Sequence, residues 1–189
     1  MQVPPAWHLP PSAERAIYDL HENQLEDPGY QRFLSRMAEP LAERVPTGAE
    51  GLDFGCGPAP ALAAMLGRKG LKVSLYDLYY HPDANVFARC WDFITATEVV
   101  EHLARPGQEL ERLWKCLRPG GWLGIMTKRV IDTDAFSRWH YKNDMTHISF
   151  FSDATFTWLA NHWNAELHSA GADVVLLRKP LSREPDAIP

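Results

Sequence analysis

Cysteine is scarce in this sequence of 189 residues: Cys56, Cys90 and Cys116 are the only three. Their odd number and scattered positions match neither a disulfide framework nor a zinc site, so reduced thiols in the cytoplasm are expected. Cys56 lies in a glycine-rich loop with no neighbouring base in the sequence. We therefore expect its small side chain to pack there rather than react.

The sequence also lacks long apolar runs and positive net charge. No apolar run approaches the roughly 18 residues of a membrane-spanning helix. The proline-rich residues 1–11 have neither the basic flank nor the apolar core of a signal peptide. A formal net charge of −5 and a pI near 5.9 argue against broad binding to nucleic acids or anionic membranes. With 46% apolar residues, the chain can bury the core of one ordinary domain.

A glycine-rich loop follows the short apolar segment 50–54 and precedes an apolar segment, 62–66, that begins a helix. Glycine allows the backbone to approach a ligand closely. A loop between the carboxyl end of a strand and a helix is where open α/β sheets bind nucleotides. The third glycine of the dinucleotide fingerprint is missing. Asp53 would also repel a pyrophosphate, whereas it suits a ligand that carries an ammonium group.

A second acidic residue, Asp77, ends the next expected strand, 24 residues beyond Asp53. A carboxylate at the end of the second strand of a nucleotide-binding sheet accepts hydrogen bonds from ribose hydroxyls. Leu78, beside it, is placed to lie against an adenine ring.

The alternation of strand and helix signals with short connections predicts a mainly parallel sheet. We therefore expect an α/β, doubly wound, Rossmann-like fold with a C-terminal antiparallel hairpin. The expected elements are two helices at 12–25 and 30–41, strands at 50–54, 71–76, 91–97 and 122–127, a reduced strand around 85–88, helices at 62–66, 108–117 and from Ser152 or Asp153 onward, and a hairpin at 165–177.

Glu98, Glu101 and His102 follow the strand expected at 91–97 at positions i, i+3 and i+4. One helical turn would place all three on a single face. Two carboxylates and an imidazole can bind a divalent cation, and the oxygen-rich set favours magnesium or manganese, with zinc or iron as alternatives. Two other interpretations stay open. Acids are favoured in the first turn of any helix, and a histidine can act as a general base without metal.

The run Asp53-Phe54-Gly55-Cys56-Gly57 resembles the first motif of class I S-adenosylmethionine-dependent methyltransferases, although Ala59 replaces a glycine common there. The turn Leu117-Arg118-Pro119-Gly120-Gly121 before an apolar strand is also familiar from that superfamily. The resemblance spans residues 48–178. It implies S-adenosylmethionine as cofactor, an N-terminal helical cap at 1–47 and a cofactor-binding methyltransferase domain at 48–189. The cofactor contacts expected are Asp53, Gly55, Cys56, Gly57, Asp77, Leu78 and Thr97.

The Glu-x-x-Glu-His spacing resembles that of small-RNA 3′-terminal 2′-O-methyltransferases and ubiquinone-pathway O-methyltransferases. In the former a later histidine completes a metal site, and His147 matches it here. A narrower likeness, to uncharacterised bacterial methyltransferase-domain proteins, lies around Trp139 to His147 and names no substrate. The resemblance implies that catalysis, and metal binding by magnesium or manganese, rest on Glu98, Glu101, His102 and His147. The expected substrate contacts are His21, Trp139, His140 and Tyr141.

The reaction implied is O-methylation of a small hydroxylated acceptor, which the acidic composition favours over a long nucleic acid. A short RNA terminus is the alternative acceptor. A protein that binds S-adenosylmethionine as a regulatory or partner subunit, without turnover, is the alternative outside catalysis. A dehydrogenase is a weaker rival, and it predicts affinity for a nicotinamide cofactor instead. The oligomeric state is not fixed by the sequence.

Overall fold

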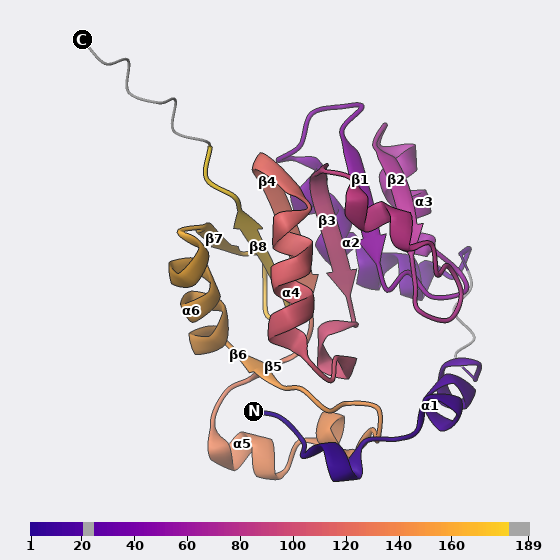
Figure 1. The fold of residues 1–189 in the computed structure, drawn as a ribbon, viewed down its shortest axis with the longest axis vertical. Coiled ribbons are helices and arrows are strands. Elements are labelled where there is room, and N and C mark those ends of the chain that lie inside the picture. Colours follow the sequence, from indigo (N-terminus) through magenta and orange to yellow (C-terminus); the bar gives the residue numbers. More distant parts are fainter. Residues whose placement is uncertain (21–24, 182–189) are drawn as a thin grey trace.

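The computed structural model describes residues 1–20 and 25–181, and its centre is a six-stranded sheet (Figure 1). The strand order is β2-β1-β3-β4-β8-β7. Strands β1 to β4 run parallel, whereas β8 is antiparallel to both β4 and β7. This confirms the expected parallel sheet with a closing hairpin. The bounds are β1 (Glu50–Phe54), β2 (Lys72–Tyr76), β3 (Trp91–Thr97), β4 (Leu117–Met126), β7 (Glu166–Ser169) and β8 (Val174–Arg178).

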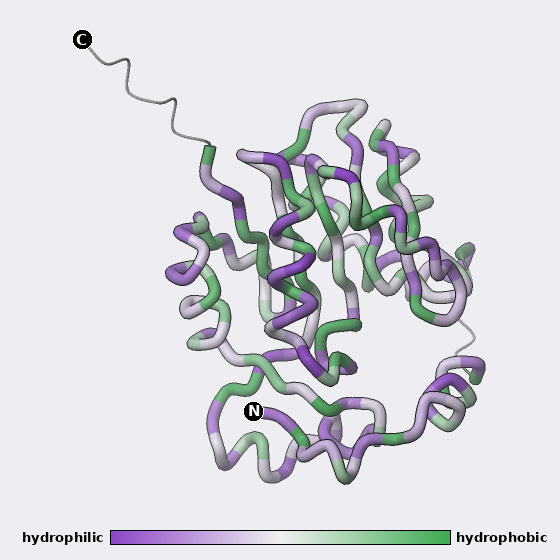
Figure 2. Tube along the Cα trace, in the orientation of Figure 1, coloured by the Kyte–Doolittle hydropathy of each residue, from purple (hydrophilic) through white to green (hydrophobic). Residues whose placement is uncertain are grey.

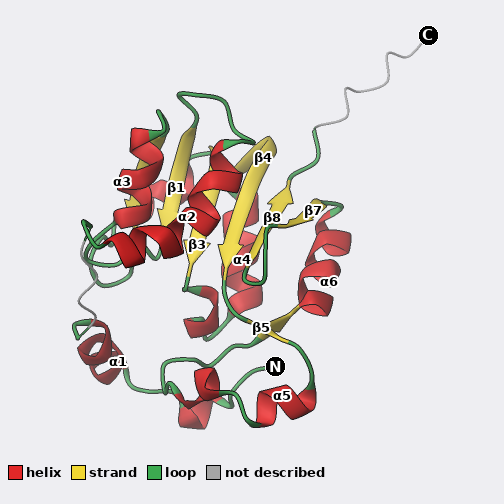
Figure 3. Ribbon diagram, turned by 180° about the vertical axis from the view of Figure 1, so that it is seen from behind, coloured by secondary structure: helices red, strands yellow, loops and turns green. Residues whose placement is uncertain are grey.

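Helices cover both faces of this sheet, as Figures 1 and 3 show from opposite sides. Because successive side chains of a strand point to opposite faces, β3 supplies Phe93 to one buried layer and Ile94 to the other. The first layer is covered by α2 (Pro28–Ala42) and α3 (Ala61–Arg68), and the second by α4 (Pro106–Lys115) and α6 (Asp153–Trp163).

The apolar spacing of α4 determines which of its faces is buried. Leu110, Leu113 and Trp114 recur at i, i+3 and i+4 and are buried against the sheet. Hydrophobic and hydrophilic segments accordingly alternate along this helix in Figure 2. The helix begins at Pro106, two residues before the expected start, and ends at Lys115, because Leu117 already pairs with Trp91 in the sheet.

Several local expectations were wrong. The helix expected at 12–25 ends at Tyr18, and the turn expected before the strand at 122–127 lies within β4, which begins at Leu117. The segment 85–88 is not a strand: Ala84–Ala88 forms a 3-10 helix, η2, whose first turn the Asp83 carboxylate caps through the Asn85 N–H. Ser12 does not cap the first helix, since α1 (Pro11–Tyr18) begins one residue earlier, and a proline at the first helical position is itself favourable. The cap of α6 is confirmed as Ser152, which forms a capping box with Thr155.

The N-terminal segment lies across the carboxyl edge of the sheet, beside the loops that follow the strands (Figure 1). The Met1 amine donates to the Phe150 carbonyl at 2.8 Å, and the Val3 N–H donates to the Ile148 carbonyl at 2.8 Å. The N-terminal segment contains the short 3-10 helix η1 (Pro5–Trp7). Two further short elements at this end of the molecule are α5 (Thr133–Ser137) and η4 (His140–Asn143). A two-stranded parallel pair, β5 (Arg129–Val130) and β6 (Phe151–Ser152), closes this end.

The helix α2 belongs to the layer that covers the sheet, since Met37 and Leu41 are fully buried in it. By contrast, α1 has no buried residue. The division of the chain into a cap at 1–47 and a domain at 48–189 stays a prediction. Among the described residues, no helix has both the length and the apolar character needed to cross a membrane.

Candidate active site

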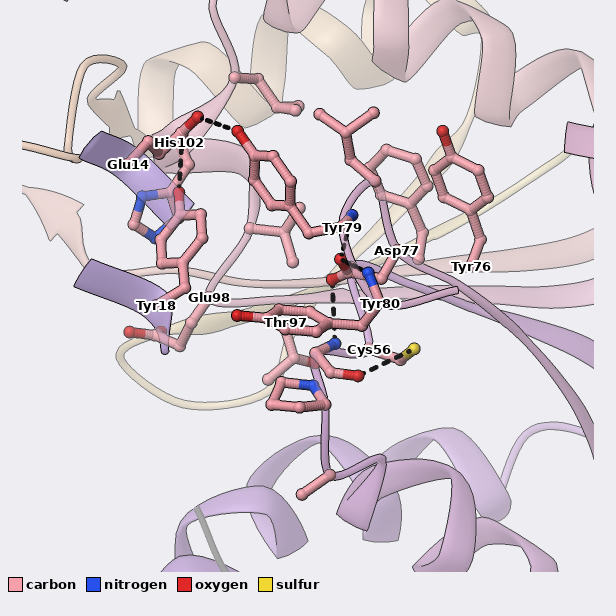
Figure 4. A pocket seen from close by; sticks show the side chains of 18 of the residues that line it. Glu14, Tyr18, Cys56, Tyr76, Asp77, Tyr79, Tyr80, Thr97, Glu98 and His102 are labelled. Atoms are coloured by element: carbon pink, nitrogen blue, oxygen red, sulfur yellow. Dashed lines mark hydrogen bonds between the residues drawn. The ribbon is translucent and has the colours of Figure 1, made fainter. Parts of the chain in front are cut away.

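A cavity of about 500 Å³ opens where β1, β2 and β3 end at the carboxyl edge of the sheet. This is the position at which parallel sheets of this kind bind ligands. Loops after the three strands form its floor, and α1 and the start of α2 complete its wall (Figure 4). Among the described residues that line the cavity, none is a lysine or an arginine. Four are acidic: Glu14, Asp77, Glu98 and Asp144.

The glycine loop and Asp77 meet, as the sequence predicted. Gly55 and Gly57 have φ values of 76° and 65°, the left-handed region that glycine adopts at little cost. A Cβ atom on Gly55 would lie 2.4 Å from a Val99 methyl group, so the loop also needs glycine for space. Asp77 accepts hydrogen bonds from the Gly57 N–H at 3.0 Å and the Tyr79 N–H at 2.8 Å (Figure 4). The carboxylate thereby joins the two loops.

Asp53 lies beneath this loop rather than in the cavity lining. Its side chain is 3% exposed and accepts a hydrogen bond from the Thr95 hydroxyl at 2.7 Å. Burial raises the pKa of Asp53 to about 6, against the opposing effect of the Thr95 hydrogen bond. Direct contact of this carboxylate with a methionyl group stays a prediction.

Glu98 does not share a helical face with Glu101 and His102, so that expectation was wrong. The strand β3 ends at Thr97, and η3 (Val100–His102) is a single 3-10 turn that begins after Glu98. Glu98 itself has φ 53°, an uncommon conformation for a side-chain-bearing residue and one that clusters at functional sites. Burial, and secondarily the Glu101 carboxylate, raise the pKa of Glu98 to about 8.

Glu101 is fully buried at the base of the site. Its Oε1 accepts a hydrogen bond from the Tyr141 hydroxyl. Its Oε2 is buried without a hydrogen-bond partner among the described residues. Burial raises the pKa of Glu101, while the Tyr141 hydrogen bond acts in the opposite direction. An unpartnered buried carboxylate oxygen costs free energy, so this atom is one that a ligand would stabilise.

Two backbone carbonyls orient the two histidines. His102 Nδ1 lies 3.0 Å from the Thr146 carbonyl oxygen, and His147 Nδ1 lies 2.7 Å from the Tyr141 carbonyl oxygen. Because a carbonyl only accepts, each Nδ1 carries the proton, and in the neutral ring the lone pair is on Nε2. Burial lowers the pKa of His147, which favours that neutral form. Asp144 fixes Thr146 by accepting from its N–H at 2.9 Å and its hydroxyl at 2.6 Å.

Glu101, His102 and His147 converge. Each offers one ligand atom, and these atoms all lie within 4.8 Å of one another. Glu98 is not part of this group in the structure, although the sequence analysis included it. The observed donor set is one oxygen and two nitrogens, which shifts the preference away from magnesium toward zinc, manganese or iron.

Three residues predicted to contact the cofactor line this cavity: Cys56, Leu78 and Thr97. Burial raises the pKa of the Cys56 thiol to about 12, so it is an unreactive neutral group, as expected. The predicted substrate residues are dispersed: Trp139 lines a different cavity and His140 is exposed. Tyr141 is buried beside Glu101, and His21 lies outside the described residues.

The sequence analysis missed a group of hydrogen-bonded side chains at the cavity mouth (Figure 4). Glu14 of α1 accepts from the Tyr18 hydroxyl at 2.8 Å and from the Tyr79 hydroxyl at 2.6 Å. The Tyr18 ring also meets the His102 ring edge-on, with centroids 5.4 Å apart. The spacing of Glu14 and Tyr18 at i, i+4 was a usable signal, but nothing in the sequence placed α1 opposite Tyr79.

The parallel sheet, its closing hairpin and the glycine loop at the end of β1 define a class I methyltransferase fold. A family model described as a methyltransferase domain matches residues 24–170, so the chain belongs to that family. It is an S-adenosylmethionine-dependent methyltransferase. A search among curated proteins gave no match.

Solved structures agree in fold. An O-methyltransferase family protein from Burkholderia thailandensis has a TM-score of 0.60 and 15% identity, covering 91% of this chain and 60% of that one. A candidate S-adenosylmethionine-dependent methyltransferase from Methanococcus maripaludis has a TM-score of 0.59 and 14% identity, covering 92% and 94%. The mitomycin 7-O-methyltransferase MmcR has a TM-score of 0.56 and 13% identity, covering 87% and 59%. At these identities the likeness shows the fold alone.

Proposed function

We propose that this methyltransferase transfers the methyl group of S-adenosylmethionine to a hydroxyl oxygen of a small acceptor. The observation that carries the proposal is the convergence of Glu101, His102 and His147 beside the cofactor cavity. A cavity of about 500 Å³ must hold both the cofactor and the reacting end of the acceptor, which favours a small molecule. The O-methyltransferase neighbours in the fold comparison are consistent with this choice.

The cofactor would lie along the loops that form the cavity floor. Asp77 is placed to accept from the ribose hydroxyls, and Leu78 to contact the adenine ring. Gly55, Cys56 and Gly57 would pass beneath the methionyl end, while Thr97 and Asp53 support it from β3 and β1. The acidic lining suits a cofactor with sulfonium and ammonium charges. The same lining disfavours a short RNA terminus, because its phosphates would meet carboxylates and the described residues that line this cavity include neither lysine nor arginine.

The three converging residues fit a divalent cation. Each residue offers one ligand atom within 4.8 Å of the other two, and Oε2 of Glu101 is buried without a hydrogen-bond partner among the described residues. The carbonyl acceptors at both Nδ1 atoms are the outer hydrogen bonds that metal-ligating histidines use. A divalent cation held there would make an acceptor hydroxyl more acidic near neutral pH.

Methyl transfer is an in-line displacement in which the acceptor oxygen forms a bond to the methyl carbon as the carbon–sulfur bond breaks. The products are the methyl ether and S-adenosylhomocysteine, and the hydroxyl proton must leave. Where no cation is held, His147 is a suitable proton acceptor because burial keeps its ring neutral. Tyr141 and Thr146 hold the two rings in place through their carbonyls, so the chain chiefly supplies alignment.

The test uses four acceptors of similar size: catechol, phenol, aniline and thiophenol. Each is incubated with S-adenosylmethionine labelled in the methyl group, and the product is identified by mass spectrometry. We expect label on oxygen, with catechol the better substrate because two adjacent hydroxyls can share a cation. Transfer to aniline instead would refute O-methylation and leave the methyltransferase assignment intact.

A matched pair of variants tests the assignment of the histidine. His147→Ala should lose most of the turnover, whereas His140→Ala, exposed in the same segment, should keep it. Both should bind S-adenosylhomocysteine in calorimetric titration. Equal turnover in the two variants would contradict the role of His147. The expected cytoplasmic location and the oligomeric state stay predictions beside this proposal.

A further inference from the structure

A second cavity, of about 710 Å³, lies beyond the end of β4, and none of its lining residues lines the first cavity. It is formed by the β4–β5 connection, α5 and the beginning of α6. Trp139, predicted to contact substrate, belongs to this cavity. Its polar lining includes two cations, Lys128 and Arg129, and two acids, Asp153 and Asp173.

Three of these four charges are already neutralised. Arg129 pairs with the Asp153 carboxylate at 2.7 Å and donates to the Ala172 carbonyl at 2.9 Å. It also donates to the Gly171 carbonyl and the Ser169 hydroxyl, so each of its three side-chain nitrogens has a partner. Asp173 pairs with Arg36 at 2.5 Å.

Lys128 is the remaining charge. It is half-buried and forms neither an ion pair nor a hydrogen bond within residues 1–20 and 25–181. Its Nζ lies 5.0 Å from the centre of the Tyr141 ring, a contact that compensates only part of the cost of burying an ammonium group. Its charge also lowers the pKa of Glu98, against the larger effect of burial, so Lys128 acts on that carboxyl at longer range but has no ion-pair partner among the described residues.

Apart from Ser152, the rest of the lining is apolar. Phe136 and Trp139 pack edge to face with ring centroids 6.2 Å apart, and Ile131 is 86% exposed at the rim. An exposed isoleucine beside two aromatic rings is a surface that an apolar ligand would cover.

We propose that the second cavity binds an organic anion with an aromatic body and a single carboxylate, held by Lys128. A carboxylate is favoured over a phosphate because Arg129, the group suited to two-point phosphate recognition, has its donors engaged, and one lysine compensates one charge. The site is adjacent to the reaction centre. The Tyr141 ring lies 4.8 Å from the Trp139 ring on one side and 4.0 Å from the His147 ring on the other.

The experiment titrates the whole chain with 2-naphthoate, 2-naphthyl phosphate, 2-naphthamide and 2-naphthylmethylamine by calorimetry. All four share one aromatic body and differ in charge. We expect 2-naphthoate to bind at least tenfold more tightly than the amide and the amine. We also expect Lys128→Met to weaken it at least tenfold, because the variant keeps the apolar stem and removes the charge. Lys72→Met, a lysine exposed on β2, should leave the affinity unchanged.

The titrations are then repeated with saturating S-adenosylhomocysteine, which we expect to occupy the first cavity. This shows which of the two cavities binds the probe, whatever the acceptor of the methyl group is. Binding of 2-naphthoate that persists supports the second cavity, and its loss would place the probe in the first cavity and overturn the proposal. Equal affinity for 2-naphthamide, tighter binding of 2-naphthyl phosphate, or an unchanged affinity in Lys128→Met would each overturn it as well. Trp139→Leu gives a second variant, expected to weaken all four probes alike.

Discussion

The Tyr141 hydroxyl donates a hydrogen bond to Glu101 in the buried base of the active site, joining two residues 40 positions apart in the sequence. Glu101 in turn accepts the N–H groups of Ile148 and Ser149 through its own backbone carbonyl, at 2.8 Å each. Glu101, in the 3-10 turn η3 after β3, thus holds both ends of the segment 141–149. That segment carries His147 and the Thr146 carbonyl that orients His102. One buried residue, through its carboxylate and its backbone carbonyl, therefore organises most of the candidate active site.

The first prediction concerns this pair. Tyr141→Phe should destabilise the protein by about 1–3 kcal/mol because it removes a donor from a buried carboxylate oxygen. Urea denaturation measures the change. Tyr80→Phe is the control, since it removes a solvent-exposed hydrogen bond of 2.6 Å to Asp19. Equal stability of the two variants would show that the Tyr141 hydroxyl does not support Glu101.

The second prediction concerns the loop contact of Asp77. Asp77→Asn should weaken S-adenosylhomocysteine binding at least tenfold, about 1.4 kcal/mol, in calorimetric titration. Asparagine offers one acceptor oxygen, so it cannot receive both the Gly57 and the Tyr79 N–H groups as the carboxylate does. Asp83→Asn, whose carboxylate caps η2, is the control. An unchanged dissociation constant in a folded Asp77→Asn protein would remove this residue from the cofactor site.

The third prediction concerns metal removal. Treatment with a chelator, followed by dialysis, should abolish O-methylation. Manganese, zinc or cobalt should restore it better than magnesium, because two of the three donors are imidazole nitrogens. His102→Gln should lower the affinity for manganese, measured by electron paramagnetic resonance. Full activity after chelation would instead assign the histidines to general-base catalysis.

The fourth prediction concerns pH and uses metal-free protein. Burial raises the pKa of Glu98 from 4.5 to about 8, so the folded protein binds a proton there that the unfolded chain releases between these values. Stability contributed by this group is therefore complete below pH 4.5 and is lost as the pH rises toward 8. Thermal unfolding at pH 5.5 and 8 should show a smaller fall in Tm for Glu98→Gln than for the unchanged protein. An identical fall in both would show that Glu98 titrates normally.

Much of the fold was predictable because its signals are local. The apolar spacing of Leu110, Leu113 and Trp114 predicted α4, and Ser152 or Asp153 was expected to mark the start of α6, which Ser152 caps. The reduced strand at 85–88 failed because a short apolar run does not distinguish a strand from one helical turn. The geometry after Thr97 failed for a different reason. The helical spacing of Glu98, Glu101 and His102 is a property of a continuous helix, and the backbone at Glu98 is left-handed.

The sequence by itself determined the class of this protein and the loops that we propose bind its cofactor. Gly55, Gly57 and Asp77 act through backbone conformation and short connections, which local residue types dictate. Only the tertiary structure decided which distant groups meet. It separated Glu98 from the cluster of Glu101, His102 and His147 and brought Glu14 to Tyr79. It also left Lys128 without an ion-pair partner among the residues that the structure describes. These outcomes depend on how the segments 1–18 and 128–149 pack over the sheet edge, and no local pattern encodes packing between segments so far apart in the chain.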